Sequence, residues 1–112
     1  MADFYPDLVS SLPDADIPVA GVQGKLLQGE YGQVVFFDLA ANAKVPPHAH
    51  GAQWGVVLEG TMELTIGGKA RTYRKGDAYY IPAGITHAAI FITRSKALDF
   101  FADKDRYRIK IK

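Results

Sequence analysis

The sequence predicts a small all-β protein of the sandwich or barrel type. Three observations predict this class. The 112 residues suit a single domain. Short β-prone runs are separated by turn residues at regular spacing, and no segment shows the apolar periodicity of an amphipathic helix. With 48% hydrophobic residues, a chain of this length can bury a core without disulfides.

Residues 1–20 are predicted to form an N-terminal arm. They lack periodicity and contain three prolines, Pro6, Pro13 and Pro18, so we expect loose structure with room for one turn of helix. The barrel domain is predicted to span residues 21–112.

The barrel domain is predicted to begin with two hairpins. Residues 21–28 and 33–39 are β-prone runs separated by a glycine-bounded turn at 29–32. A second hairpin joins residues 53–58 to 62–66, where apolar and polar residues alternate as in a half-buried strand. The remaining predicted strands are residues 69–73, 78–81, 86–93 and 97–101. The total of about eight or nine short strands is typical of sandwiches and barrels.

The composition excludes several classes of function. The chain has no cysteine, so disulfides and thiol chemistry are excluded. Its 13 basic and 12 acidic side chains are mixed along the chain and give a net charge of +1, so no nucleic-acid partner is expected. No stretch approaches the roughly 20 apolar residues of a membrane span, and no membrane partner is expected. Because Asp3 and Asp7 stand where a secretory signal needs basic residues, we expect a soluble cytoplasmic protein.

All three histidines fall within two short motifs, Pro46-Pro47-His48-Ala49-His50 and Pro82-Ala83-Gly84-Ile85-Thr86-His87. Side chains two apart in a β-strand point to one face, so His48 and His50 are predicted to aim two ring nitrogens at one point. A metal that prefers nitrogen and oxygen ligands needs further groups from elsewhere in the fold. Gln53 and His87 are the candidates. The alternative is that these histidines are ordinary loop or core side chains.

The sequence resembles the cupin superfamily over residues 33–101. The family's first motif, a histidine pair, a glutamate and a glycine, is matched by His48, His50, Gln53 and Gly60. Glutamine replaces the usual glutamate and lies one residue closer to the histidine pair. The second motif is matched in full by Gly76, Pro82, Gly84 and His87. The resemblance implies a cupin double-stranded β-helix, a jelly-roll β-barrel whose mouth holds a metal ligated by the motif residues.

The cofactor predicted by these ligands is one divalent transition-metal ion. Imidazole and amide ligands are compatible with Mn, Fe, Ni, Co and Zn, so they do not identify the metal. If Gln53 is a ligand in place of glutamate, the ion keeps its full charge and is a stronger Lewis acid, which favours hydrolytic or isomerising chemistry over redox chemistry. The alternative for Gln53 is an outward-facing, hydrogen-bonding role.

Asp99 is the candidate catalytic acid or base. It lies in the middle of the predicted strand 97–101, where a charged side chain is unusual and suggests a function. Parity places it on one face with Ala97 and Phe101. If this face points inward, Asp99 lies near the metal with its pKa set by burial. The alternative is an ion pair with an arginine such as Arg106.

One cupin subgroup is especially similar, the small single-domain proteins like the pectin-degradation protein of the uronate pathway. Its members carry two histidines, a glutamine and a third histidine, and an Asp-x-Phe pair followed by an arginine, which Asp99, Phe101 and Arg106 match. The resemblance implies ring opening of a 4,5-unsaturated uronate to a linear keto sugar acid. Asp99 would then transfer protons and Arg106 would pair with the substrate carboxylate. Phe91, which has the parity of His87, is expected to be an aromatic wall for the ligand.

Two other functions remain open at this point. One is a metal-dependent dioxygenase for a catechol, a thiol or an enediol, and the other is a non-catalytic module that binds a small molecule such as a sugar. A fourth alternative, a structural protein of the storage-cupin type, is the least favoured. We also expect a homodimer, because residues 88–92 are apolar at both parities and exceed what one lumen can bury.

Overall fold

The computed structural model describes residues 4–111; residues 1–3 and 112, at the outer ends of the predicted arm and barrel domain, lie outside it. Within this range a single turn of helix, α1 (Asp7–Ser10), precedes nine strands. The strands are β1 (Val22–Gly29), β2 (Gly32–Leu39), β3 (Lys44–His48), β4 (Gln53–Glu59), β5 (Thr61–Ile66), β6 (Lys69–Arg74), β7 (Ala78–Ile81), β8 (His87–Phe91) and β9 (Ser95–Phe101).

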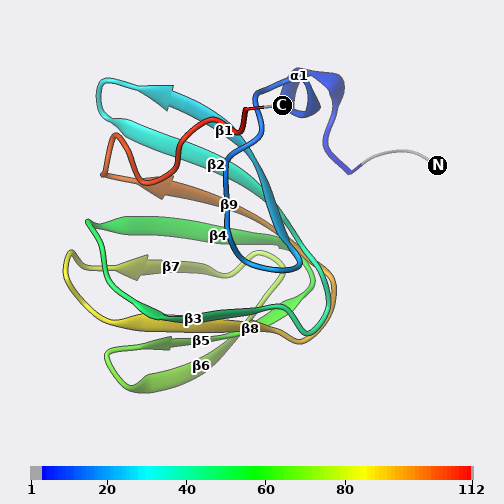
Figure 1. The fold of residues 1–112 in the computed structure, drawn as a ribbon. Helices are drawn as coiled ribbons and strands as arrows, with labels where there is room; N and C mark the ends of the chain where they lie inside the picture. Colours follow the sequence, from blue (N-terminus) through cyan, green and yellow to red (C-terminus); the bar gives the residue numbers. More distant parts are fainter. Residues whose placement is uncertain (1–3, 112) are drawn as a thin grey trace.

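The strands form two antiparallel sheets that lie over one another as two layers (Figure 1). The five-stranded sheet has the order β1-β2-β9-β4-β7, and the four-stranded sheet has the order β3-β8-β5-β6. Strands far apart in sequence pair directly, as β2 does with β9 and β3 with β8. The predicted all-β jelly roll is therefore confirmed.

The strand carrying the first histidine motif differs from the prediction. β3 ends at His48, so His50 lies in the following loop and not on the same strand. The register of β3 against β8 shifts between Val45 and His48, where Pro46 and Pro47 have no N–H to donate. Because β3 is an edge strand, these prolines are tolerated, but they end its regular pairing. The prediction that both histidines share one strand face is wrong.

The core lies between the two sheets. Val35 and Val57 point inward from the five-stranded sheet, and Met62 and Leu64 point inward from the four-stranded sheet; all four are almost fully buried. Burying a side chain of this size contributes about 1.5–3 kcal/mol, so the alternation of apolar residues fixes which face of each strand points inward.

The N-terminal arm packs against the barrel and against the chain that follows β9. The Tyr5 hydroxyl donates a hydrogen bond to the carbonyl oxygen of Phe37 at 2.7 Å. Isolated bridges join Asp14 to Lys25 and Ala15 to Ile109, and Ala15 is buried. The C-terminal end of the chain accordingly lies beside the arm in Figure 1.

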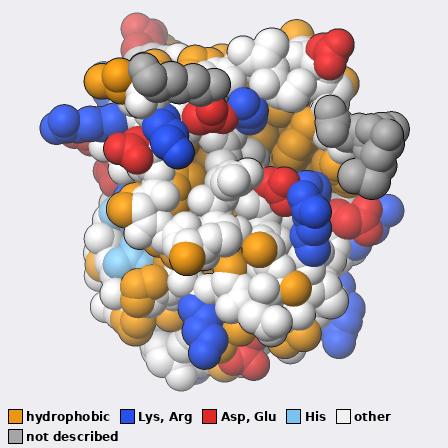
Figure 2. All heavy atoms as spheres, turned by 45° about the vertical axis from the view of Figure 1, so that its right-hand side comes forward, with side chains coloured by type: hydrophobic (Ala, Val, Ile, Leu, Met, Phe, Trp, Pro, Cys, Tyr) orange, Lys and Arg blue, Asp and Glu red, His pale blue; other side chains and the backbone are white. Residues whose placement is uncertain are grey.

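The surface carries both signs of charge. Figure 2 shows acidic and basic side chains interspersed over one side of the molecule, with histidine visible at its left edge. Among the described residues, no helix has the length and apolar character that crossing a membrane requires.

Candidate metal centre

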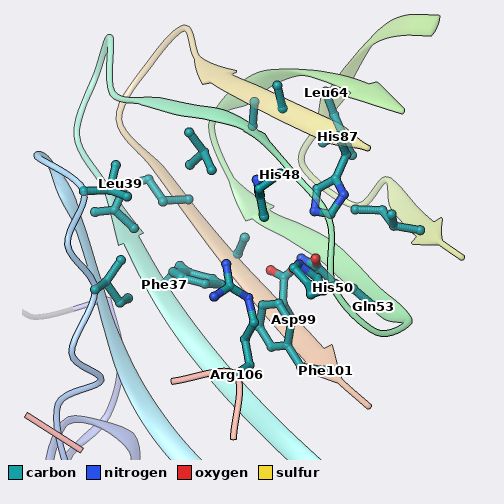
Figure 3. A pocket seen from close by; sticks show the side chains of 18 of the residues that line it. Phe37, Leu39, His48, His50, Gln53, Leu64, His87, Asp99, Phe101 and Arg106 are labelled. Atoms are coloured by element: carbon teal, nitrogen blue, oxygen red, sulfur yellow. The ribbon is translucent and has the colours of Figure 1, made fainter. Parts of the chain in front are cut away.

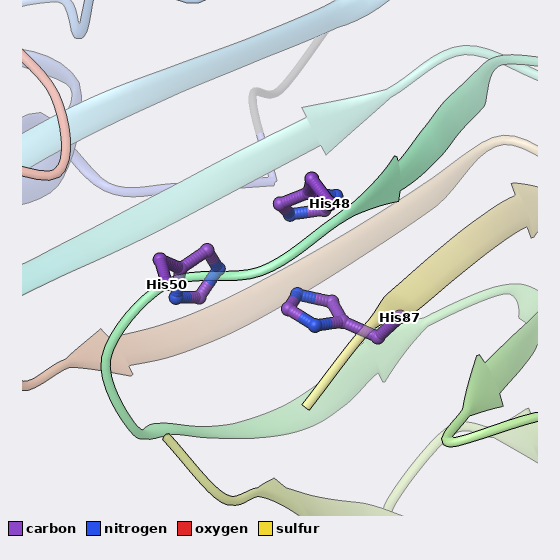
Figure 4. Close-up of side chains that lie close together, drawn as sticks. All are labelled: His48, His50 and His87. Carbon is purple, nitrogen blue, oxygen red and sulfur yellow. The ribbon is translucent and has the colours of Figure 1, made fainter. Parts of the chain in front are cut away.

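Three histidines from separate segments of the chain lie together at one end of the barrel. His48 ends β3 and pairs in register with His87, the first residue of β8, while His50 lies in the loop after β3. Their candidate ligand atoms all lie within 4.8 Å of one another, and Figure 4 shows the three rings grouped closely. The loop thus places His50 close to His48 and His87, where the sequence analysis expected it to lie as part of the strand.

Backbone carbonyl groups set the tautomer of each ring. The pairs are His48 Nδ1 with Pro46 O at 2.8 Å, His50 Nδ1 with Gly51 O at 2.8 Å, and His87 Nδ1 with Ile85 O at 2.9 Å. A carbonyl oxygen only accepts, so each Nδ1 carries the proton and each Nε2 keeps a free lone pair. The Nε2 atoms of His50 and His87 are buried without a hydrogen-bond partner. This is the state that a metal ligand requires, and the three histidines are positioned to hold a metal ion.

The electrostatic surroundings favour neutral imidazoles. Burial lowers the pKa of His50 below its ordinary value, and the nearby charges of Arg106 and His48 lower it further. Burial lowers the pKa of His87 as well, and the other two histidines add to the effect. Both rings are therefore neutral at neutral pH, with the proton on Nδ1, and Nε2 can coordinate a metal.

Gln53, the first residue of β4, faces the cavity and contacts Asp99. Its Nε2 donates a hydrogen bond to Asp99 Oδ2 at 2.6 Å, which fixes the orientation of the amide. Its Oε1 is consequently directed away from the carboxyl group and is buried without a partner. The outward-facing alternative for Gln53 does not match this geometry.

Asp99 lies on the inner face of β9, as parity predicted. Its side chain is 2% exposed, and the Tyr79 hydroxyl donates to Oδ1 at 3.0 Å and to Oδ2 at 2.8 Å. Burial raises the pKa of Asp99 to about 7, while the hydrogen bonds from Gln53 and Tyr79 oppose the rise. The alternative ion pair with Arg106 is not among the salt bridges of the described residues.

Tyr79 and Gly55 support Asp99, and the sequence analysis missed both roles. Gly55 on β4 is the register partner of Asp99 on β9 and of Tyr79 on β7. A Cβ at Gly55 would collide with the Asp99 carboxylate and with the Tyr79 ring. The sequence did contain a signal for this packing, since Gly55 lies inside a predicted strand, where a glycine often marks a close approach of other groups.

Arg106 is held by an interaction that the sequence analysis also missed. Gln33 on β2 is fully buried; its Nε2 donates to the carbonyl oxygen of Tyr107 at 2.8 Å, and its Oε1 accepts from the Tyr107 N–H at 3.0 Å. The guanidinium of Arg106 then lies 4.4 Å from the centroid of the Tyr107 ring and 5.9 Å from that of Phe101. Its Nε is buried without a hydrogen-bond partner.

These groups line a cavity of about 420 Å³ inside the barrel. Phe91, predicted as an aromatic wall for a ligand, is buried and lines it too, as does Phe101. Figure 3 shows Asp99, Gln53 and the histidines together on one side, with Leu39 on the opposite side. The cavity is thus polar at the histidines and lined by aliphatic and aromatic side chains elsewhere. Its size lies within the range of small-molecule sites, about 300–1,000 Å³.

Solved structures with the same fold include three that bear on this site. KdgF from Halomonas sp. is 26% identical with a TM-score of 0.72, and the match covers 81% of this chain and 89% of that one. An RmlC-like cupin from Shewanella frigidimarina is 19% identical with a TM-score of 0.76, covering 93% and 95%. A variant of oxalate decarboxylase from Bacillus subtilis is 20% identical with a TM-score of 0.74, covering 86% of this chain but 28% of that one. The last two likenesses show the fold alone.

A search of curated proteins finds no match. The family model described as the cupin domain matches residues 35–101, which include all three histidines and every strand from β3 to β9. The matched segment also contains Gln53, Tyr79 and Asp99. The chain therefore belongs to the cupin domain family.

Proposed function

We propose that this cupin is a metal-dependent enzyme that opens the ring of a 4,5-unsaturated uronate to give a linear keto sugar acid. The observation that carries the proposal is the convergence of three imidazole nitrogens and one buried carboxyl group on a single cavity. Such a cavity with few, convergent polar groups and a strongly shifted pKa is the usual form of an active site.

His48, His50 and His87 would hold one divalent transition-metal ion, with Gln53 Oε1 as the fourth ligand. The unpartnered Nε2 atoms and the unpartnered Oε1 are donors of the kind that Mn, Fe, Ni, Co and Zn accept. All four ligands are neutral, so the ion would supply strong Lewis acidity toward a hydroxyl or carbonyl oxygen of the substrate.

Asp99 would transfer the protons. In the ring opening, the C1 hydroxyl loses its proton, the bond between C1 and the ring oxygen breaks to leave an aldehyde at C1 and an enolate at C5, and the enolate becomes a ketone by taking a proton at C4. One group that first accepts and then returns a proton is sufficient for this sequence. A carboxyl group with its pKa raised to about 7 is matched to both steps at neutral pH.

Arg106 would bind the substrate carboxylate. Its guanidinium is held against aromatic rings and its Nε has no internal partner, so it is free to form a charge-assisted pair with an acid. Phe91 and Phe101 would form the walls beside the sugar ring. The likeness to KdgF from Halomonas sp. agrees with the subgroup resemblance found in the sequence, which matches Asp99, Phe101 and Arg106.

The test is turnover of unsaturated galacturonate by the metal-loaded protein. Turnover is monitored as the loss of the ultraviolet absorbance of the conjugated double bond. We expect turnover by the wild type and a loss of at least about 100-fold in Asp99→Asn, because general acid–base catalysis typically contributes 10²–10⁴-fold. The variant must retain its metal for the comparison to count. Absence of turnover by metal-loaded wild type excludes this substrate.

A second candidate function is supported by the aliphatic part of the cavity. Val22, Leu39, Met62 and Leu64 offer no hydrogen bonds to the hydroxyl groups of a sugar. A less polar substrate such as a catechol suits this lining and is the class that a metal-dependent dioxygenase would use. The uncharged Gln53 is the argument against it, since it stabilises a higher metal oxidation state less well than glutamate.

Oxygen uptake separates the candidates. Uptake with a catechol, a thiol or an enediol by the iron-loaded protein, without turnover of unsaturated galacturonate, would favour the dioxygenase. Stabilisation by galacturonate without turnover or oxygen uptake would favour a non-catalytic sugar-binding cupin.

A further inference from the structure

Tyr79 is a buried polar side chain to which the proposed mechanism gives no role. It lies on β7, is 6% exposed and lines the cavity. Its hydroxyl lies 3.0 Å from Asp99 Oδ1 and 2.8 Å from Asp99 Oδ2, so it bridges both oxygen atoms of the carboxyl group. A hydroxyl shared by both oxygens fixes the plane of that group relative to β7 as well as to β9.

The hydrogen bonds continue from Asp99 to Gln53. Asp99 Oδ2 accepts from the Tyr79 hydroxyl and also from Gln53 Nε2, which lies 2.6 Å away. The three side chains meet because β4 lies between β9 and β7 in the sheet. Figure 3 shows the far end of this row, where Gln53 and Asp99 lie on the histidine side of the cavity. The last atom of the row is Gln53 Oε1, which is buried without a partner.

The orientation of the Gln53 amide decides whether it can be a metal ligand. An amide group has an oxygen end that coordinates a metal and an NH₂ end that does not. Oxygen atoms of Asp99 that already accept from Tyr79 are suited to face the NH₂ end, because the opposite orientation would place two acceptors in contact. Burial, together with the neighbouring Asp99, raises the pKa of Tyr79 well above its ordinary value, so the hydroxyl keeps its proton and donates.

A neighbouring tyrosine shows that burial alone does not produce this arrangement. Tyr73 on β6 is 8% exposed, and its ring packs edge-on against that of Tyr79 with the centroids 5.5 Å apart. The Tyr73 hydroxyl, however, has no hydrogen-bond partner among the described residues. The two residues therefore share a ring contact and a degree of burial, and they differ in the hydrogen bonds to Asp99.

We propose that Tyr79 is a positioning residue of the metal centre, which acts by holding Asp99 so that Asp99 keeps Gln53 Oε1 turned toward the metal. The inference rests on the proposed function in one respect, the assignment of Gln53 as the fourth ligand. It adds that the ligand set depends on a hydroxyl two hydrogen bonds away from the ligand atom. Groups that orient a metal ligand through hydrogen bonds typically change the metal affinity about 10- to 100-fold.

The test is the affinity of the metal-free protein for Co²⁺, measured by competition with a chelator in the absence of substrate. Tyr79→Phe removes the hydroxyl and keeps the ring in place. We expect it to weaken Co²⁺ binding about 10- to 100-fold and to change the visible spectrum of the bound ion, because an oxygen ligand is no longer held. Tyr73→Phe is the matched control and should keep the affinity and the spectrum of the wild type.

A double-mutant cycle separates positioning of Gln53 from a general loss of packing. Gln53→Ala should weaken binding by itself. Adding Tyr79→Phe to Gln53→Ala should weaken it no further, because the oxygen through which Tyr79 acts is gone. If Tyr79→Phe fails to fold, Tyr79→Met, a flexible apolar side chain that also lacks the hydroxyl, takes its place.

Two results would overturn the inference while leaving the proposed function intact. One is equal Co²⁺ affinity in wild type and Tyr79→Phe, and the other is an equal loss from Tyr79→Phe with and without Gln53. The expected cycle without turnover of unsaturated galacturonate would remove the proposed substrate and support the inference. A wild type that binds no Co²⁺ would overturn both.

Discussion

On the inner face of the five-stranded sheet Gln53 and Asp99 are polar groups turned into the barrel, whereas on the outer face of the same strands Trp54 and Phe100 are exposed rings. At these neighbouring positions the distribution is the reverse of that in an ordinary half-buried sheet, where apolar residues point inward and polar residues outward. A difference of a single position along β4 or β9 separates the two kinds of surface.

The comparison indicates that neither face is arranged for the stability of the isolated chain. A buried acceptor such as Gln53 Oε1 without a partner costs about 1–3 kcal/mol. An exposed aromatic side chain forgoes about 1.5–3 kcal/mol of burial. The departure on the inner face is accounted for if that face binds a metal and a small molecule.

The largest expected effect concerns the buried acid of the inner face. The pKa of Asp99 is about 7 in the folded protein and 3.8 for the ordinary group. The folded state therefore holds this proton more tightly than the unfolded chain. Its contribution to stability is fully present below a pH of about 4 and is lost as the pH rises through about 7. Urea denaturation of metal-free wild type should show a loss on the order of a few kcal/mol across this window.

Asp99→Asn should remove this part of the pH dependence, because the amide does not ionise. Asp105→Asn, at an exposed position, should leave the pH dependence as in the wild type. Equal slopes for wild type and Asp99→Asn would show that Asp99 is ionised in the folded protein at low pH, contrary to the burial argument.

The second effect tests how closely the inner face is packed. Gly55→Ala places a methyl group against the Asp99 carboxylate and the Tyr79 ring. We expect a loss of about 1–3 kcal/mol in the free energy of unfolding, the usual cost of overpacking. Gly29→Ala is the control, since a Cβ there meets no atom within 4 Å. The packing argument fails if urea denaturation gives both variants the same free energy of unfolding.

The smallest effect is expected on the outer face, at its rim. Arg94 Nη2 lies 2.9 Å from Asp38 Oδ2, but the Arg94 side chain is 68% exposed. Arg94→Ala should leave the free energy of unfolding almost unchanged, because exposed ion pairs contribute little and are screened by salt. A thermal denaturation series with and without added salt checks this. A larger loss would mean that this exposed ion pair contributes to the fold itself.

The sequence predicted the strands of this fold well because local patterns determine them. Alternation of apolar and polar residues identified β5, and glycines marked the turns between strands. Parity along β9 also predicted correctly that Asp99 shares a face with Ala97 and Phe101, all three of which are buried. These inferences depend on neighbours in sequence only.

The parts that the sequence analysis missed depend on which strands lie side by side. Gly55, Asp99 and Tyr79 form one row only because β4 lies between β9 and β7 in the sheet. The support of Tyr107 by Gln33 joins residues 74 positions apart. His50 reaches its partners through a loop, whose path strand parity does not describe.

The measurement that tests the account most directly is the elemental metal content of protein purified without chelator and without added tag histidines. We expect about one transition-metal ion per chain in the wild type. His50→Ala should lose it, whereas Arg94→Ala, which alters only the surface, should keep it. No bound metal in the wild type even after reconstitution, or an unchanged content in His50→Ala, would contradict the assignment of the inner face as a metal centre.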